Sequence, residues 1–308
     1  MTINELKKWG IAQLKRLTEL PPPSRVLPET VRIEVSLFLQ ETFGLTQEQL
    51  ILHGDREITK EITPEQTEKF KSFIQRRMQS EPVAYILGKK DFYNHTFVVD
   101  SSVLIPRPET ELLVELALKY FDENTRNFYI ADICTGSGVI ILSIVDELRR
   151  KFGEQYLSYG EFHAVDISDN ALNIARKNAS TMNLAQQVKF YKSDLCSEIS
   201  VAGDRTLILF IANPPYIMEG APLPADVEMF EPRIALKAGE DGLSIIRRLL
   251  HELTAKLKLG AKLIMEIGEE QEAGVREILC TEISCAGIED SFKFVRDYSG
   301  KVRVVWII

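Results

Sequence analysis

The chain has 308 residues and carries 37 Lys and Arg against 45 Asp and Glu, which gives a formal net charge of −8. This length favours two domains, and a hydrophobic share of 45% is typical of a soluble globular protein. We find no apolar run of membrane-spanning length and no apolar core of a secretory signal, so we expect a cytoplasmic protein. The cysteines lack CxxC spacing and nearby histidines, which argues against disulfides and against a bound metal: Cys134, Cys196, Cys280 and Cys285.

The charge is unevenly distributed along the chain. Residues 1–90 carry 14 basic and 12 acidic residues, whereas residues 91–308 carry 23 basic and 33 acidic ones. An acidic main domain repels phosphate backbones, so nucleic acid is a disfavoured partner, although a local basic patch is not excluded.

The first part of the chain predicts a small all-α domain over residues 1–87. Apolar residues between positions 31 and 43 recur at helical spacing, and Gly44 follows them as a stop signal. Thr63 and Gln66 are spaced as a capping box around a proline at the first helical position. Such a domain can be a packing appendage or can dock a protein substrate, and the pattern alone favours neither.

Residues 88–108 predict a β-hairpin linker. Phe92 and Phe97 flank a turn that we place at Asn94 and His95. The two phenylalanines can wall a substrate pocket, although packing of the hairpin is the simpler interpretation.

Residues 109–308 predict a catalytic domain of the α/β class. Five apolar runs are typical of strands buried on both faces, and two further runs joined by a short turn must pair antiparallel. A doubly wound seven-strand sheet with an antiparallel last strand resembles the class I S-adenosylmethionine-dependent methyltransferase fold. The expected strands cover residues 129–133, 161–165, 188–191, 207–212, 262–267, 293–297 and 302–308.

A loop of small residues follows the first of these strands. In open α/β sheets ligands bind at the carboxyl ends of strands, and glycines let a backbone turn tightly beside a ligand. The spacing departs from the GxGxxG of dinucleotide-binding proteins, and the nearby Asp132 suits a cationic cofactor better than a pyrophosphate. S-adenosylmethionine carries a sulfonium and an ammonium group. The loop, which includes Cys134, Thr135, Gly136, Ser137 and Gly138, therefore suits this cofactor.

Acidic residues also end the next two strands. Asp166 closes the second strand, where an ionised carboxylate can accept hydrogen bonds from both ribose hydroxyls. Asp194 and Leu195 end the third strand, where they can contact an adenine ring. Each acidic residue taken singly is more simply a helix N-cap or a surface charge, so the prediction depends on their recurrence at consecutive strand ends.

The segment after the fourth strand carries the chemistry. Pro214 and Pro215 fix the backbone and present carbonyl oxygens rigidly beside the Asn213 amide. A planar –NH₂ group held between Asn213 Oδ1 and the Pro214 carbonyl turns its nitrogen toward an incoming methyl group, and Tyr216 can stack on it. These groups would act by positioning the substrate nitrogen. The candidate catalytic residues are therefore Asn213, Pro214 and Tyr216, and the candidate substrate site is residues 213–216.

These motifs resemble those of the HemK-type protein-(glutamine-N5) methyltransferases, which modify peptide-chain release factors. The resemblance covers nearly the whole chain. NPPY is shared with enzymes that methylate amino groups of DNA and RNA, whereas LIPRPETE at 104–111 and FEPR at 230–233 are more specific to the glutamine enzymes.

The resemblance implies S-adenosylmethionine as donor and a release-factor Gly-Gly-Gln glutamine as substrate. It implies cofactor contacts from residues 134–138, Asp166, Leu195 and Asn213, with the substrate amide on residues 213–216. It also implies that the helical domain helps to dock the release factor and that the protein acts as a monomer.

The sequence departs from the family pattern at three positions, and three alternative functions stay open. Cys134, Asn94 and Glu240 stand where the family often has glycine. Cys134 is small and should still permit the turn, and the other two lie outside the segment that does the chemistry. The alternatives are methylation of a ribosomal-protein glutamine, methylation of nucleic acid, and a catalytically silent binding module. The acidic main domain argues against the second, and intact Asn213 argues against the third. Arg107 can anchor substrate or hold domains together, and Arg233 is expected to organise its loop.

Overall fold

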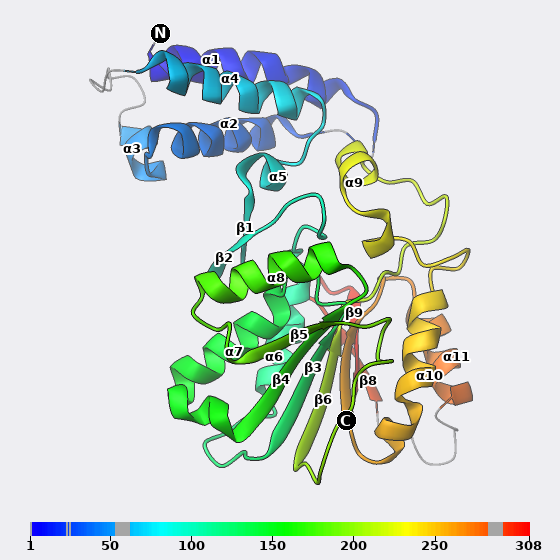
Figure 1. Cartoon of the computed structure of the whole chain (residues 1–308). Coiled ribbons are helices and arrows are strands. Elements are labelled where there is room, and N and C mark those ends of the chain that lie inside the picture. Colours follow the sequence, from blue (N-terminus) through cyan, green and yellow to red (C-terminus); the bar gives the residue numbers. More distant parts are fainter. Residues whose placement is uncertain (1, 23, 25, 53–61, 283–291) are drawn as a thin grey trace. The chain divides into compact units, whose positions relative to one another are not determined.

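Figure 1 shows a computed structural model of the chain, which describes residues 2–22, 24, 26–52, 62–282 and 292–308. Backbone contacts divide it into two compact units: a helical unit, Met1–Gly88 with Pro222–Glu231, and a sheet unit, Lys89–Ala221 with Pro232–Ile308. The sequence did not anticipate that Pro222–Glu231 belongs with the helical unit, or that the hairpin belongs to the sheet unit. Cys285 lies outside the described residues.

The helical unit forms where the local signals place it. The capping box is confirmed, since Thr63 and Gln66 each accept a hydrogen bond at 3.1 Å from the other's backbone N–H. Gly44 ends its helix in the left-handed region at φ 64°. In the returning segment, the Ala225 N–H donates to Ser24 Oγ at 2.9 Å. The helices are α1 Ile3–Leu14, α2 Pro28–Phe43, α3 Gln47–Leu52, α4 Pro64–Met78, α5 Val83–Leu87 and α9 Ala225–Phe230.

The predicted seven-strand sheet is confirmed. Its order is β5-β4-β3-β6-β7-β9-β8, with parallel pairing from β5 to β7 and antiparallel pairing of β9 with both neighbours. The strands are β3 Phe128–Ile133, β4 Gly160–Asp166, β5 Val188–Lys192, β6 Leu207–Ala212, β7 Lys262–Glu266, β8 Phe292–Arg296 and β9 Val302–Ile307.

Helices cover both faces of this sheet (Figure 1). Phe128 and Ile130 of β3 pack into the apolar layer of one set of helices, whereas Tyr129 and Ala131 pack into the layer of the other. This period of two buries both faces of a central strand, which explains its continuous apolar sequence. One set is α6 Glu111–Leu118, α7 Val139–Phe152 and α8 Asp169–Thr181, and the other is α10 Ser244–Lys258 and α11 Glu272–Glu282. None of the described helices is both long and apolar enough to cross a membrane.

The hairpin consists of β1 Lys89–Phe92 and β2 His95–Val98. The predicted turn position was wrong by one residue, because His95 pairs with Phe92 and the turn lies at Tyr93 and Asn94, with Tyr93 at φ 54°. Phe92 and Phe97 are buried with ring centroids 6.2 Å apart, so they pack the core of the sheet unit.

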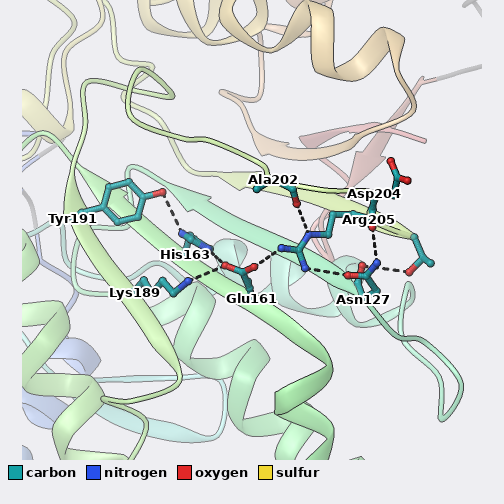
Figure 2. Close-up of polar contacts among 9 residues, drawn as sticks. Asn127, Glu161, His163, Lys189, Tyr191, Ala202, Asp204 and Arg205 are labelled. Atoms are coloured by element: carbon teal, nitrogen blue, oxygen red, sulfur yellow. Dashed lines mark hydrogen bonds and ion pairs between the residues drawn. The ribbon is translucent and has the colours of Figure 1, made fainter.

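A polar network ties the amino ends of the strands to the loop that precedes β6 (Figure 2). Glu161 near the start of β4 pairs with Lys189 Nζ at 2.8 Å and with Arg205, and these contacts lower its pKa to about 2. His163 Nδ1 lies 3.2 Å from the Tyr191 hydroxyl in the same network. The described segment between β5 and β6 contains no helix, so this network fastens it to the sheet at the end opposite the glycine loop.

Candidate active site

The loop after β3 has the backbone that its small residues allow. Cys134, Gly136 and Gly138 all have positive φ, at 59°, 55° and 81°. A Cβ on Gly138 would lie 3.2 Å from Ala175 Cβ, so a side chain there would crowd α8. Cys134 carries a Cβ, so its left-handed conformation costs about 1–2 kcal/mol relative to glycine.

Asp166 at the end of β4 holds this loop. Its Oδ2 accepts a hydrogen bond from the Gly136 N–H at 2.9 Å, and its Oδ1 accepts one from the Ser168 N–H at 2.9 Å. Burial raises the pKa of Asp166, and these two hydrogen bonds oppose that rise. Each carboxylate oxygen keeps a second lone pair for a ligand, so Asp166 can both organise the loop and bind a ribose.

Asp132 lies beneath the loop and is completely buried. Thr135 Oγ1 donates to its Oδ2 at 2.6 Å, while Oδ1 has no hydrogen-bond partner among the described residues. Burial raises the pKa of Asp132 to about 7. Below about pH 7 the Asp132 side chain is therefore mostly protonated, and it supports the loop through its hydrogen bond with Thr135.

A cavity of about 310 Å³ opens at the carboxyl ends of the strands. It brings together most of the predicted site residues: Cys134, Thr135, Gly136, Ser137, Asp166, Leu195, Asn213 and Pro215. Gly138, Pro214 and Tyr216 do not line it, and neither do the hairpin phenylalanines. The sequence missed several other lining residues, among them Pro106, Thr110, Ile234, Ile245 and Arg248. The PRPET run could have indicated the first two, but nothing local marks Arg248 on α10.

The Asn213–Tyr216 segment leaves β6 at the edge of this cavity. Asn213 Nδ2 donates to Thr110 Oγ1 at 3.2 Å. The Tyr216 hydroxyl donates to Glu266 Oε1 at 3.0 Å, and its backbone carbonyl accepts from Gln271 Nε2 at 2.9 Å. Burial and the neighbouring carboxylate raise the pKa of Tyr216, so its phenol is neutral and acts as a hydrogen-bond donor to Glu266.

The cavity fits S-adenosylmethionine by the chemistry of its lining. The glycine loop lets the backbone approach closely, and Asp166 presents a carboxylate beside the loop for ribose hydroxyls. The described residues contain no group of three or more His, Cys, Asp or Glu side chains arranged to hold a metal ion.

Sheet order, glycine loop and strand-end carboxylates together define a class I S-adenosylmethionine-dependent methyltransferase. Residues 25–88 match the PrmC N-terminal domain family, and residues 109–231 match the methyltransferase small domain family.

Relatives extend the match over nearly the whole chain. A release factor glutamine methyltransferase of Neisseria gonorrhoeae is 37% identical over 90% of this chain and 93% of its own. Those of Koribacter versatilis and Caulobacter vibrioides are 34% and 31% identical, over 97% and 99% of this chain and 97% and 96% of their own. The hMettl16 catalytic domain, solved in complex with the MAT2A 3'UTR hairpin 6, shares the fold with a TM-score of 0.50 at 15% identity, over 80% of this chain and 82% of that one. The chain belongs to the release factor glutamine methyltransferase family, which confirms the resemblance seen in the sequence.

Proposed function

We propose that this protein transfers a methyl group from S-adenosylmethionine to the side-chain amide nitrogen, N5, of the glutamine in the Gly-Gly-Gln motif of peptide-chain release factors. The observation that carries the proposal is that Asn213 of the NPPY segment lines the same cavity as the glycine loop and Asp166. Family membership supports the substrate class.

The residues work by positioning. Bound S-adenosylmethionine supplies an electrophilic methyl group. Residues 134–138, Asp166 and Leu195 bind the cofactor, while Asn213 Oδ1 and the Pro214 carbonyl accept the two hydrogens of the substrate –NH₂ group. Orientation of this kind brings the weakly basic nitrogen into line with the methyl group, and it can account for a large share of a rate enhancement. The methylated amide cation is a strong acid, so it can lose its proton to water without a dedicated base.

We further propose separate roles for three segments of the chain. Residues 1–87 form a helical domain that docks the release factor, residues 88–108 form a hairpin linker, and residues 109–308 form the catalytic domain. The protein works in the cytoplasm as a monomer, where translation supplies its substrate.

The test is methyl transfer from labelled donor to purified release factor. We expect label on the wild-type factor, none on a factor whose Gly-Gly-Gln glutamine is replaced, and none with Asn213→Ala. Label on transfer RNA, DNA or a ribosomal protein in place of the release factor would contradict the proposal. Full activity of Asn213→Ala would contradict the assigned role of that side chain.

A further inference from the structure

A chain of hydrogen bonds leads from the candidate catalytic amide into the core of the sheet unit. Asn213 Nδ2 donates to Thr110 Oγ1 at 3.2 Å, and Thr110 Oγ1 donates to Glu266 Oε2 at 2.7 Å. The other oxygen of Glu266 accepts from the Tyr216 hydroxyl at 3.0 Å. We propose that Glu266 and Thr110 are positioning residues that fix which face of the Asn213 amide meets the substrate.

The donors and acceptors available at Thr110 determine how the Asn213 amide is oriented. A threonine hydroxyl has one hydrogen to donate, and in the structure Thr110 donates it to Glu266 Oε2. Because the Thr110 hydrogen goes to Glu266, its oxygen can only accept from Asn213. The group of Asn213 that faces Thr110 must therefore be the –NH₂, and Oδ1 must occupy the other branch of the amide. Among the described residues, Oδ1 accepts no hydrogen bond, which leaves it for the –NH₂ of a substrate in the cavity.

Burial gives this arrangement its rigidity. Glu266 and Thr110 are each 2% exposed, so water does not compete for their hydrogen bonds. A buried carboxylate is costly unless it is well bonded. Each oxygen of Glu266 accepts one hydrogen bond, one from Thr110 and one from Tyr216. Because Thr110 in turn accepts from Asn213, Glu266 stabilises both ends of the NPPY segment. Burial raises the pKa of Glu266, and the hydrogen bonds from Thr110 and Tyr216 oppose that rise.

Tyr216 is also held from its backbone. Gln271 Nε2 donates to the Tyr216 carbonyl at 2.9 Å and to the Gly242 carbonyl at 3.0 Å. Glu266 at the end of β7 therefore binds the phenol of Tyr216, and Gln271 just before α11 binds its backbone carbonyl. Residues 213–216 are thus held against β7 through Glu266, the residue that also orients the Asn213 amide through Thr110.

The inference rests on the proposed function, so wild-type methyl transfer to the release factor is measured first. In Thr110→Val, which keeps the shape and removes the hydroxyl, we expect kcat to fall about tenfold to hundredfold, with the release-factor KM and the S-adenosylhomocysteine Kd within about twofold. Thr110→Ser keeps the hydroxyl and should restore kcat to within about threefold of the wild type. Glu266→Gln should lower kcat similarly, and the double variant should lose no more than the worse single one, because the two residues act as a unit.

Thr42→Val in the helical unit is the matched control. Thr42 is buried, and its hydroxyl has no hydrogen-bond partner among the described residues, so kcat should not change. Thermal unfolding identifies variants that fail to fold. If Thr110→Val keeps wild-type kcat, the inference is overturned while the proposed function stands.

A second readout does not depend on turnover. The side-chain amide protons of Asn213 can be assigned in a ¹⁵N spectrum by their loss in Asn213→Ala. We expect Thr110→Val to shift them and to speed their exchange with water, and Thr42→Val to leave them unchanged. Unchanged amide signals in Thr110→Val would overturn the inference even if the wild-type enzyme proved to have another substrate, whereas absence of wild-type methyl transfer would overturn only the proposed function.

Discussion

The Asn178 side chain and the Val98 backbone exchange a reciprocal pair of hydrogen bonds. The Val98 N–H donates to Asn178 Oδ1 at 2.7 Å, and Asn178 Nδ2 donates back to the Val98 carbonyl at 3.0 Å. The second hydrogen of Nδ2 goes to the Ser137 carbonyl in the glycine loop at 2.9 Å. One buried amide on α8 thus joins the hairpin to the loop that lines the cavity.

Asn178→Leu should destabilise the sheet unit and weaken cofactor binding. Three backbone groups would lose a buried partner, and we expect a loss of at least about 2 kcal/mol in the free energy of unfolding. Urea unfolding can be followed by the fluorescence of Trp306 in a Trp9→Phe background, which isolates the sheet unit. Exposed Asn124→Ala is the control and should change stability by less than about 0.5 kcal/mol. A loss under about 1 kcal/mol in Asn178→Leu would contradict the structural role given to this amide.

Gly138→Ala should impair the cofactor site, whereas Gly44→Ala should not. Both glycines have positive φ, at 81° and 64°, so alanine costs about 1–2 kcal/mol of backbone strain at either position. Only at Gly138 does the new Cβ meet neighbours, 3.2 Å from Ala175 and from Leu142, whereas nothing lies within 4 Å of it at Gly44. Calorimetry with S-adenosylhomocysteine should show at least about tenfold weaker binding for Gly138→Ala, because the loop must shift. Equal affinities for the two variants would show that the close approach to α8 has no bearing on binding.

Asp132 should make the sheet unit less stable as the pH rises toward neutrality. Its pKa is raised by burial from an ordinary value near 3.8 to about 7. Between those two values the folded state holds a proton that the unfolded state has released, so stability is lost as the pH rises through this window. Melting temperatures from pH 4.5 to pH 8 should fall more steeply for the wild type than for Asp132→Asn. Parallel curves for the two proteins would rule out a raised pKa at this position.

Arg77→Met should destabilise the helical unit strongly. Arg77 Nε lies 3.0 Å from Glu34 Oε2, with side chains 5% and 9% exposed, and burial raises the pKa of Glu34 despite this pairing. Removing the guanidinium strands a buried carboxyl, which costs about 3–5 kcal/mol. Unfolding followed by Trp9 in a Trp306→Phe background measures the effect.

The paired control for Arg77→Met uses an exposed ion pair. Lys71 Nζ lies 2.9 Å from Glu68 Oε1 on the solvent side of α4, and Lys71→Met should cost less than about 0.5 kcal/mol. Adding Glu34→Leu to Arg77→Met should recover much of the stability, because the stranded carboxyl is then gone. A double variant as unstable as Arg77→Met alone would show that lost packing, not the stranded carboxyl, causes the damage.

Features with a local physical cause could be predicted from the sequence. The capping box at Thr63, the glycine stop at Gly44 and the continuous burial of β3 each depend on residues only a few positions apart. The glycine loop and the Asn213–Tyr216 segment were found for the same reason, since their backbone constraints are written in adjacent residues.

Features that depend on distant partners could not be predicted in this way. The sequence placed the hairpin turn one residue too late, because register is set by which strand faces pack inward. It did not anticipate that Pro222–Glu231 joins the helical unit, since that outcome depends on contacts made with residues such as Ser24. It also missed Glu266, which lies in an apolar strand whose pattern predicts only burial.

The sequence by itself determined the order of elements, the cofactor loop and the chemical segment, because local backbone preferences and hydrophobic periodicity specify them. The tertiary structure decided how the amide of Asn213 is oriented. Thr110 and Glu266 are 156 positions apart along the chain, and no local pattern indicates that a hydroxyl and a carboxylate at that separation share one hydrogen bond. Only the packing of α6 and β7 against β6 brings them to the same buried point.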